Sequence, residues 1–192
     1  MSEPPIVPKE IRTVFQGRVF TVRVETISLP KGGELLAEII RHPGSVVIVP
    51  VTARNEIVLV RQYRPAIGQW AWELPAGSLK PGEDIEFAAR RECQEETGQV
   101  ASYLERLGSF FPTPGYCDEQ MTFFKATGLR EPGAGDAEAH QDEDEDIEAR
   151  PFARDQLQTM ISSGQIIDLK TIAGLSLIAQ DSAPVTGPRA SV

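Results

Sequence analysis

The sequence predicts an α/β fold in which helices cover both sides of a mixed β-sheet, with an antiparallel strand subdomain in front of it. Short apolar runs rich in Val and Ile alternate with turn residues along much of the chain, as in strand-forming segments. Residues 84–97 have the periodicity of an amphipathic helix, and two more helical patterns follow near the C-terminus. Helices separated by strands in this way favour a layered α/β sandwich.

Residues 1–40 form the predicted N-terminal strand subdomain. The first ten residues are rich in proline, and strand patterns begin at residue 11. Gly17 indicates a turn in the first part, and the run Lys31-Gly32-Gly33 is a hairpin-like signal before "ELLAEIIR". We therefore expect a small antiparallel sheet here.

Three further strands are predicted for the core of the main domain. The runs "SVVIVPV" (45–51) and "EIVLVRQYR" (56–64) are almost continuously apolar or β-branched, which suits strands that are buried on both faces of a mixed sheet. The run "WAWELPAG" (70–77) is predicted as one more strand, which its proline and last glycine bring to an end.

The clearest helical pattern lies between Asp84, a good N-terminal cap, and Gly98, which suits the left-handed position after a helix end. The later elements are predicted as strands at 102–112, 121–129 and 147–152 and helices at 154–165 and 168–180. The predicted units are an N-terminal subdomain at 1–40, a main domain at 41–180 and a flexible tail at 181–192.

The composition is that of a globular protein, with 192 residues and 41% hydrophobic residues. No apolar run approaches the ~18–20 residues of a membrane span, and the N-terminus lacks the layout of a signal peptide, so we expect a cytoplasmic protein with no membrane partner. The net charge is -9, and residues 136–148 hold eight acids without a Lys or Arg. Because the rest of the chain is nearly neutral, a basic face for nucleic acid is not expected.

Three glutamates, Glu92, Glu95 and Glu96, fall within about a 100° arc of the predicted helix. Like charges at this spacing lower helix stability by a few tenths of a kcal/mol per pair. One interpretation is a solvated acidic face, in which Arg91 pairs with Glu95. The other is a half-site for hard cations, which prefer oxygen ligands and share them with substrate phosphates. Spacing alone leaves both open.

The surrounding residues resemble the Nudix box, G-x5-E-x7-R-E-U-x-E-E-x-G-U, where U is an aliphatic residue. Its seven charged or glycine positions are matched by Gly77, Glu83, Arg91, Glu92, Glu95, Glu96 and Gly98. Two positions depart from the pattern. Cys93 stands at the first U, which is a mild change, and Gln99 stands at the last, where an apolar residue normally packs.

The resemblance implies a Nudix-type α/β/α sandwich that hydrolyses a nucleoside diphosphate linked to another group, with Mg²⁺ or Mn²⁺ as cofactor. It assigns metal binding to Glu92, Glu95 and Glu96, with Glu83 and the backbone carbonyl of Ala76 as further ligands. Glu96 is also counted among the catalytic residues. The cations would neutralise the diphosphate and lower the pKa of a bound water.

Segments outside the box resemble the ADP-ribose pyrophosphatase subgroup, from about residue 41 to residue 177. By this resemblance Arg41, Arg64, Glu73 and Pro114 bind substrate. Other interpretations remain open: Arg64 as a surface residue at a strand end, Glu73 as a structural partner across the strand, and Pro114 as an ordinary turn proline. Trp70 and Trp72 are better explained by packing than by base stacking.

Relatives place the catalytic base in an acidic loop before the last strand, which is "QDEDEDIEA" here. The base should lie within hydrogen-bond reach of a metal-bound water. Glu143 is the preferred base and Glu145 the second choice, because the spacing to Ile147 fits the first glutamate better. A calcium loop over the same residues is rejected because Ile147 replaces its required glycine and Ala153 its last glutamate.

The subgroup resemblance also implies a homodimer in which the strands of residues 11–40 are exchanged between subunits. The leading functional prediction is hydrolysis of ADP-ribose to AMP and ribose 5-phosphate. Two alternatives remain. One is a hydrolase for other nucleoside diphosphate sugars, such as GDP-mannose. The other is a non-catalytic nucleotide sensor, while a purely structural acidic module would show no dependence on metal.

Overall fold

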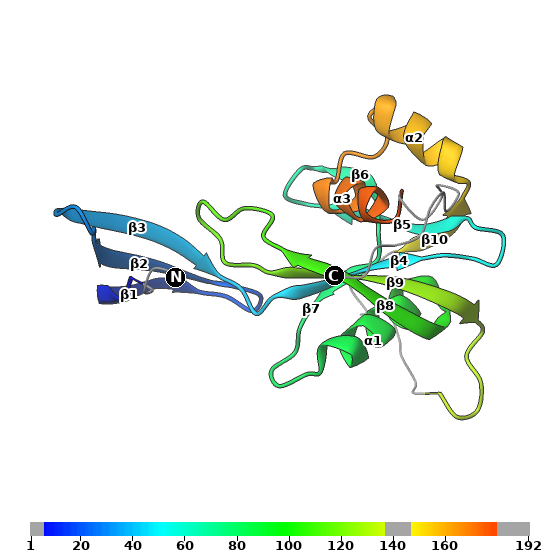
Figure 1. The fold of residues 1–192 in the computed structure, drawn as a ribbon, viewed down its shortest axis with the longest axis horizontal. Coiled ribbons are helices and arrows are strands. Elements are labelled where there is room, and N and C mark those ends of the chain that lie inside the picture. Colours follow the sequence, from blue (N-terminus) through cyan, green and yellow to red (C-terminus); the bar gives the residue numbers. More distant parts are fainter. Residues whose placement is uncertain (1–5, 137–146, 180–192) are drawn as a thin grey trace, which may run out of the picture.

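The computed structural model describes residues 6–136 and 147–179, which form an elongated molecule with a small sheet at one end and an α/β body at the other (Figure 1). The strands are β1 (Pro8–Gln16), β2 (Thr21–Ser28), β3 (Glu34–Arg41), β4 (Ser45–Pro50), β5 (Ile57–Arg64), β6 (Gln69–Glu73), β7 (Ala76–Ser78), β8 (Val100–Phe110), β9 (Met121–Arg130) and β10 (Glu148–Phe152). The helices are α1 (Ile85–Thr97), α2 (Arg154–Ser162) and α3 (Leu169–Leu177). None of the helices in these two segments is long and apolar enough to cross a membrane.

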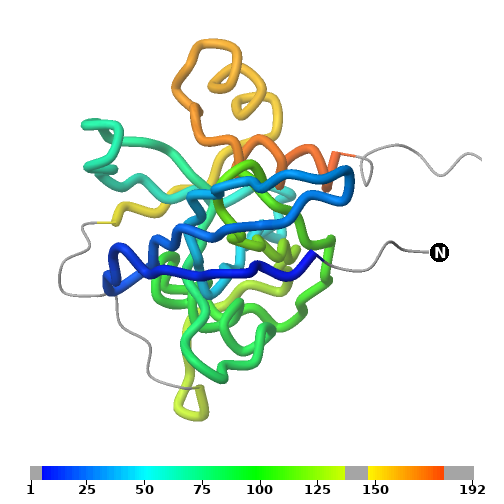
Figure 2. The backbone as a smooth tube through the Cα atoms, turned by 90° about the vertical axis from the view of Figure 1, so that its left-hand side faces the viewer, coloured from blue at the N-terminus to red at the C-terminus, as the bar shows by residue number. Residues whose placement is uncertain are grey.

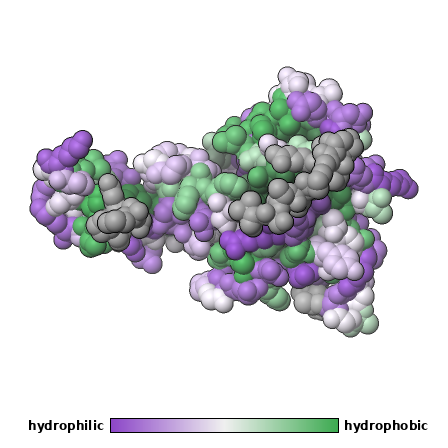
Figure 3. Space-filling model, in the orientation of Figure 1, coloured by the Kyte–Doolittle hydropathy of each residue, from purple (hydrophilic) through white to green (hydrophobic). Residues whose placement is uncertain are grey.

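The N-terminal sheet has the order β1-β2-β3 and is antiparallel throughout, as the sequence predicts. Its second hairpin turn contains Gly32 and Gly33 at φ of 89° and 92°, a conformation that glycine adopts without steric cost. Figure 2 shows the three strands crossing in front of the α/β body. Most side chains of β1 are exposed, and apolar residues lie among polar ones on this lobe (Figure 3).

The central sheet has the order β7-β4-β9-β8, with β4 parallel to β9 and antiparallel to β7. Strand β4 is buried along its whole length. Its alternate side chains enter two different cores: Val46 and Ile48 pack toward α1, whereas Val47 and Val49 pack toward α2 and α3. Figure 1 shows α1 on one side of this sheet and α3 on the other. The predicted sandwich with helices on both sides is confirmed.

The predicted single strand at 70–77 is wrong in one respect, because the chain forms two short strands here. Strand β6 joins the sheet β10-β5-β6, and β7 joins the central sheet. Between them Pro75 has no N–H to donate, and the amide of Leu74 donates to the hydroxyl of Thr171 at 2.7 Å. The backbone therefore leaves one sheet at this point and enters another. In the same way β4 and β5, both predicted for one mixed sheet, belong to different sheets.

Helix α1 has the predicted caps. The carboxylate of Asp84 accepts hydrogen bonds from the amides of Glu86 and Phe87 at 3.0 and 2.9 Å, and Gly98 follows the helix at φ of 71°. The two C-terminal helices start where predicted, with Asp168 as the cap of α3, but both end earlier than the sequence pattern suggests. These caps define where α1 and α3 begin.

Candidate active site

The box glutamates of α1 line a cavity of about 910 Å³ between α1, β7 and the N-terminal sheet. Glu92 and Glu96 are 8% and 4% exposed, so the helix turns these carboxylates inward instead of solvating them. The cavity is lined by Gly17, Arg18, Val19, Phe20, Thr21, Arg41, His42, Pro43, Arg64, Ala76, Gly77, Ser78, Leu79, Lys80, Pro81, Arg91, Glu92, Glu95 and Glu96. The acidic-face interpretation is therefore excluded for Glu92 and Glu96.

Arg91 is the cation at the centre of this group. Its Nη1 donates to Oε1 of Glu92 and Oε2 of Glu95, both at 2.6 Å, and its Nε donates to Oε1 of Glu83 at 2.7 Å. Burial opposes its charge, but hydrogen bonds to Glu83, Glu92 and Glu95 and the nearby negative charge raise the pKa of Arg91 above its ordinary value. Arg91 thus offsets the repulsion between glutamates on one helical turn.

Gly77 is required by close approach and not by its backbone angle. A Cβ atom built on Gly77 would lie 2.0 Å from the Cδ atom of Glu92. The absence of a side chain lets β7 pass directly beside the carboxylate, which brings the backbone of Ala76 and Gly77 to the same cavity wall. The amide of Ala76 donates to Oε2 of Glu96 at 3.3 Å.

The donor set on this wall suits a hard divalent cation, because it consists of carboxylate oxygens with backbone groups beside them. In the arrangement of residues 6–136 and 147–179, no three such side chains converge on a common point. Glu92 and Glu95 are turned to Arg91, and Glu96 to the Ala76 amide. A cation would have to draw these carboxylates away from those partners, so the ligand assignment stays a prediction.

Arg41 lies between this cavity and a second one. Its Nη2 donates to the buried carboxylate of Glu25 at 2.6 Å, and its Nη1 donates to Asp118 at 3.0 Å. The neighbouring amide of His42 also bonds Asp118, at 2.8 Å. The hydrogen bonds that Arg41 donates to Glu25 and Asp118 raise its pKa above the ordinary value. Arg41 is therefore a permanent cation that is fixed to the base of the N-terminal sheet.

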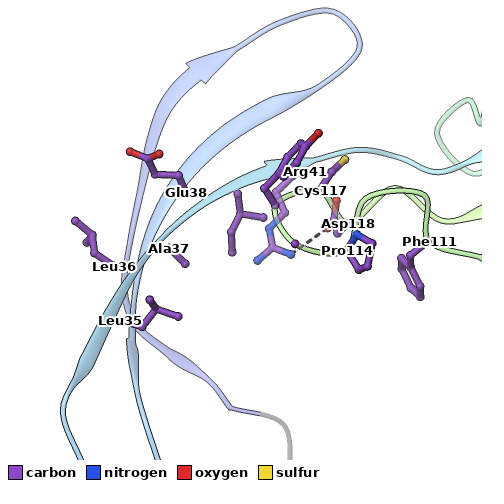
Figure 4. A pocket seen from close by; sticks show the side chains of 12 residues that line it. Leu35, Leu36, Ala37, Glu38, Arg41, Phe111, Pro114, Cys117 and Asp118 are labelled. Atoms are coloured by element: carbon purple, nitrogen blue, oxygen red, sulfur yellow. Dashed lines mark hydrogen bonds and ion pairs between the residues drawn. The ribbon is translucent and has the colours of Figure 1, made fainter.

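Pro114 does not line the cavity of the box glutamates. It lies in a separate cavity of about 630 Å³ between β3 and the loop after β8, which Arg41 also lines. Figure 4 shows Pro114 beside Asp118, with Leu35 and Leu36 on the strand opposite. Pro114 and Arg41 thus line one cavity, away from the carboxylates of α1, and the assignment of substrate binding to both stays a prediction.

Arg64 lines the cavity of about 910 Å³ and a third one of about 510 Å³. It binds Glu73 in a bidentate pair, from Nε at 2.9 Å and from Nη2 at 2.6 Å. Glu73 is 3% exposed and also accepts a hydrogen bond from Lys170 of α3. Burial raises the pKa of Glu73, but its bonds to Arg64 and the charge of Lys170 lower it by more, below its ordinary value. Arg64 faces the cavity, which fits the interpretation that it binds substrate. Glu73 is the buried partner of Arg64, which fits the structural interpretation of Glu73.

The two tryptophans pack with other side chains. The ring of Trp72 lies 4.9 Å from that of Phe152, edge to face, and Trp70 contacts Tyr63 at 5.8 Å. Neither lines the cavities described above. The packing interpretation fits these contacts.

The predicted bases Glu143 and Glu145 lie outside the described residues. Among those described, sequence reasoning missed several polar residues that hold or line the site. These are Glu25, His42, Lys80, Asp118 and Lys170. Glu25 and Lys170 contact site arginines or their partners from positions 16 and 97 residues away, and no local pattern reveals such pairs. Gln99, the departure from the box, has a buried side-chain oxygen for which the described chain offers no hydrogen-bond partner.

The profile of the NUDIX domain matches residues 41–173, so the chain belongs to the Nudix family and is a Nudix pyrophosphohydrolase. Over 179 residues it is 37% identical to the methanol dehydrogenase activator of Bacillus methanolicus, covering 91% of this chain and 94% of that one. It is 34% identical over 158 residues to the ADP-ribose pyrophosphatase of Bacillus subtilis, covering 82% and 84% of the two chains.

The ADP-ribose pyrophosphatase of Mycobacterium tuberculosis is 34% identical over 178 residues, which cover 92% of this chain and 84% of the relative. A crystal structure of an ADP compounds hydrolase superposes with a TM-score of 0.78 over 94% of this chain and 95% of that one. Its sequence is 22% identical, so this match shows the shared fold. The resemblance drawn from the box and its flanking segments is confirmed.

Proposed function

We propose that this Nudix hydrolase cleaves the diphosphate of ADP-ribose, with AMP and ribose 5-phosphate as products. The observation that carries the proposal is one cavity that the box glutamates of α1 line together with Arg41 and Arg64. Carboxylates suit the cations that accompany a diphosphate, and the arginines suit its oxygens. The ADP-ribose pyrophosphatases among its relatives supply the choice of substrate.

The proposed metal ligands are Glu92, Glu95 and Glu96, with Glu83 and the Ala76 carbonyl as further ligands. The proposed cofactor is Mg²⁺ or Mn²⁺, which when bound would neutralise the diphosphate and lower the pKa of a coordinated water. Glu83 lies off the cavity wall and bonds Arg91, which suits a supporting position.

In the proposed reaction the oxygen of a water forms a bond to one phosphorus, and the bridging P–O bond breaks. Attack on either phosphorus gives the same two products. Arg64 would bind the diphosphate through the edge of its guanidinium that Glu73 leaves free, and Arg41 would bind from the other side of the cavity. The proposed base that takes the water proton is Glu143, with Glu145 as second choice.

The proposed assembly is a homodimer formed through the N-terminal sheet. Support comes from apolar side chains that this sheet exposes, including Ile11 at 52%, Phe15 at 52% and Leu36 at 67%. Size-exclusion chromatography with light scattering tests it. A monomer at micromolar concentration would contradict the proposal.

Two other functions are set against this one. A hydrolase for other nucleoside diphosphate sugars, such as GDP-mannose, would use the same carboxylates. A non-catalytic sensor would bind nucleotide without turnover. The name of the relative from Bacillus methanolicus denotes an effect on another enzyme, so an activating role is a further outcome to be tested.

The test is hydrolysis of ADP-ribose, GDP-mannose, UDP-glucose, NADH and diadenosine polyphosphates, followed by chromatography of the nucleotide products, with Mg²⁺ or Mn²⁺, in wild type and Glu96→Gln. We expect ADP-ribose to be turned over fastest and the variant to lose about 10²-fold or more in kcat. Glu86→Gln is the matched control, because Glu86 is an exposed glutamate on the same helix that does not line the cavity. Undiminished turnover by Glu96→Gln would remove the metal-site assignment. Binding without turnover of any substrate would favour the sensor.

A further inference from the structure

A chain of buried charges runs behind Arg64, away from the box glutamates. The carboxylate of Glu73 accepts hydrogen bonds from the guanidinium of Arg64 and from Nζ of Lys170, so two cations share one carboxylate. The exposed fractions of the side chains fall from 39% for Arg64 to 4% for Glu73 and 9% for Lys170. Arg64 is thus the most exposed member of a network that continues through the buried carboxylate of Glu73 to Lys170.

Lys170 is held in place by the first turn of α3. Its Nζ also donates to Oδ2 of Asp168 at 2.9 Å, and the same oxygen accepts from the amide and the hydroxyl of Thr171 at 2.9 and 2.6 Å. The hydroxyl oxygen of Thr171 in turn accepts the amide of Leu74, the residue after Glu73. A closed set of bonds therefore ties the end of β6 to α3, and the helix cap fixes the cation that faces Glu73.

The charges explain what Lys170 adds. With Lys170 present, the two cations and the two carboxylates of Asp168 and Glu73 balance. Without it, the group would carry one net negative charge directly behind the wall that the proposed function assigns to a diphosphate. Because Nε and Nη2 of Arg64 bind Glu73, only the remaining edge of its guanidinium is available to a ligand. The attraction between that edge and an anion depends on the net charge of all four side chains in the group.

We propose that Lys170 is a positioning residue for substrate binding: it balances Glu73 and Asp168, which fixes Arg64 at the cavity wall and keeps its positive charge effective toward the diphosphate. This inference rests on the proposed function, because it assumes that a diphosphate binds at this wall. It adds a residue of α3, outside the box, to the determinants of substrate affinity.

The test compares variants that change the charge of the group in opposite directions. Lys170→Met leaves it negative, whereas Asp168→Asn leaves it positive and retains a good helix cap. Lys170→Arg preserves the charge. Lys125→Met is the matched control, since Lys125 pairs with Glu105 on the central sheet and lines none of the three cavities.

Binding of inorganic pyrophosphate to the full chain is measured by isothermal titration calorimetry without metal, and KM and kcat for ADP-ribose are measured with Mg²⁺. We expect Lys170→Met to weaken pyrophosphate binding roughly tenfold and to raise KM roughly tenfold, with kcat within a fewfold of the wild-type value. Asp168→Asn should tighten pyrophosphate binding and lower KM, each about threefold. Lys170→Arg should keep most of the affinity that Lys170→Met loses. If the role of Lys170 is merely structural, Lys170→Met and Asp168→Asn should both weaken pyrophosphate binding, or both leave it unchanged. Either result overturns the proposal. If wild type hydrolyses no nucleotide of the panel, the proposed function fails, while the pyrophosphate titrations still decide the role of Lys170.

Discussion

Replacement of Gly77 by alanine tests the geometry of the site at its tightest point. The new Cβ would lie 2.0 Å from the Cδ atom of Glu92 and 2.3 Å or less from both of its carboxylate oxygens. Real Cβ atoms do not approach other atoms so closely, so either β7 or the Glu92 side chain must move by more than an ångström. Glu92 is anchored to Arg91 at 2.6 Å, and β7 is paired with β4. Both possible movements therefore break existing interactions.

The cost follows from these contacts. Overpacking in a closely packed region costs about 1–3 kcal/mol, which corresponds to a fall in Tm of about 2–12 °C in a chain of this size. Displacement by about 1 Å of a carboxylate that is proposed to bind metal costs about 10²-fold in rate. We thus expect Gly77→Ala to fold with a moderately lower Tm and to lose most of its kcat.

The assay combines thermal unfolding with turnover of ADP-ribose. Gly135→Ala is the control, because a Cβ there has no neighbour within 4 Å and the backbone angle is ordinary. A second variant, Gly77→Ala with Glu92→Asp, shortens the opposing side chain and should recover part of the Tm but not the activity. If Gly77→Ala keeps both the Tm and the kcat of wild type, the close approach of β7 to Glu92 is not a feature of the protein in solution.

Three further predictions follow from the charged groups. Arg91→Gln should lower Tm, since it leaves three carboxylates without their cation. Added Mg²⁺ should then raise Tm more in this variant than in wild type. An equal rise in both would argue against metal binding by these glutamates. Because the pKa of Glu73 is lowered from its ordinary value of 4.5, its carboxylate stabilises the fold at higher pH, and this stabilisation is lost as pH falls below 4.5 and through the lower folded pKa; the Tm advantage of wild type over Glu73→Gln should therefore shrink as pH falls below 4.5. Arg64→Lys should raise KM for ADP-ribose about tenfold and also lower Tm, because lysine cannot keep both bonds to the buried Glu73 and offer a second edge to the diphosphate; an unchanged KM would place the diphosphate elsewhere.

Local patterns were sufficient for the helix that carries the box. Its periodicity, its Asp84 cap and its Gly98 end depend on residues within a few positions of one another, and the structure has all three. The shared face of Glu92, Glu95 and Glu96 follows from the same helical period. The cavity that receives them depends on β7 and the N-terminal sheet, which sequence spacing does not locate.

Local patterns were insufficient wherever the chain changes sheet. The apolar run at 70–77 has the composition of one strand, but the hydrogen bond from Leu74 to Thr171 joins residues 97 positions apart and divides it. The hydrophobicity of a run reports that it is buried and does not report which neighbour it pairs with. For the same reason β4 and β5 could be predicted as buried strands but not assigned to different sheets.

The sequence by itself thus determined the Nudix box, the helix that bears its glutamates and the class of enzyme, because each depends on residue identity and short-range spacing. Only the tertiary structure decided that Gly77 is needed for close approach to Glu92 and that Lys170 reaches Arg64 through Glu73. These contacts depend on how sheets and helices pack. A buried charge takes its partner from whatever element packs against it, however far away in the chain.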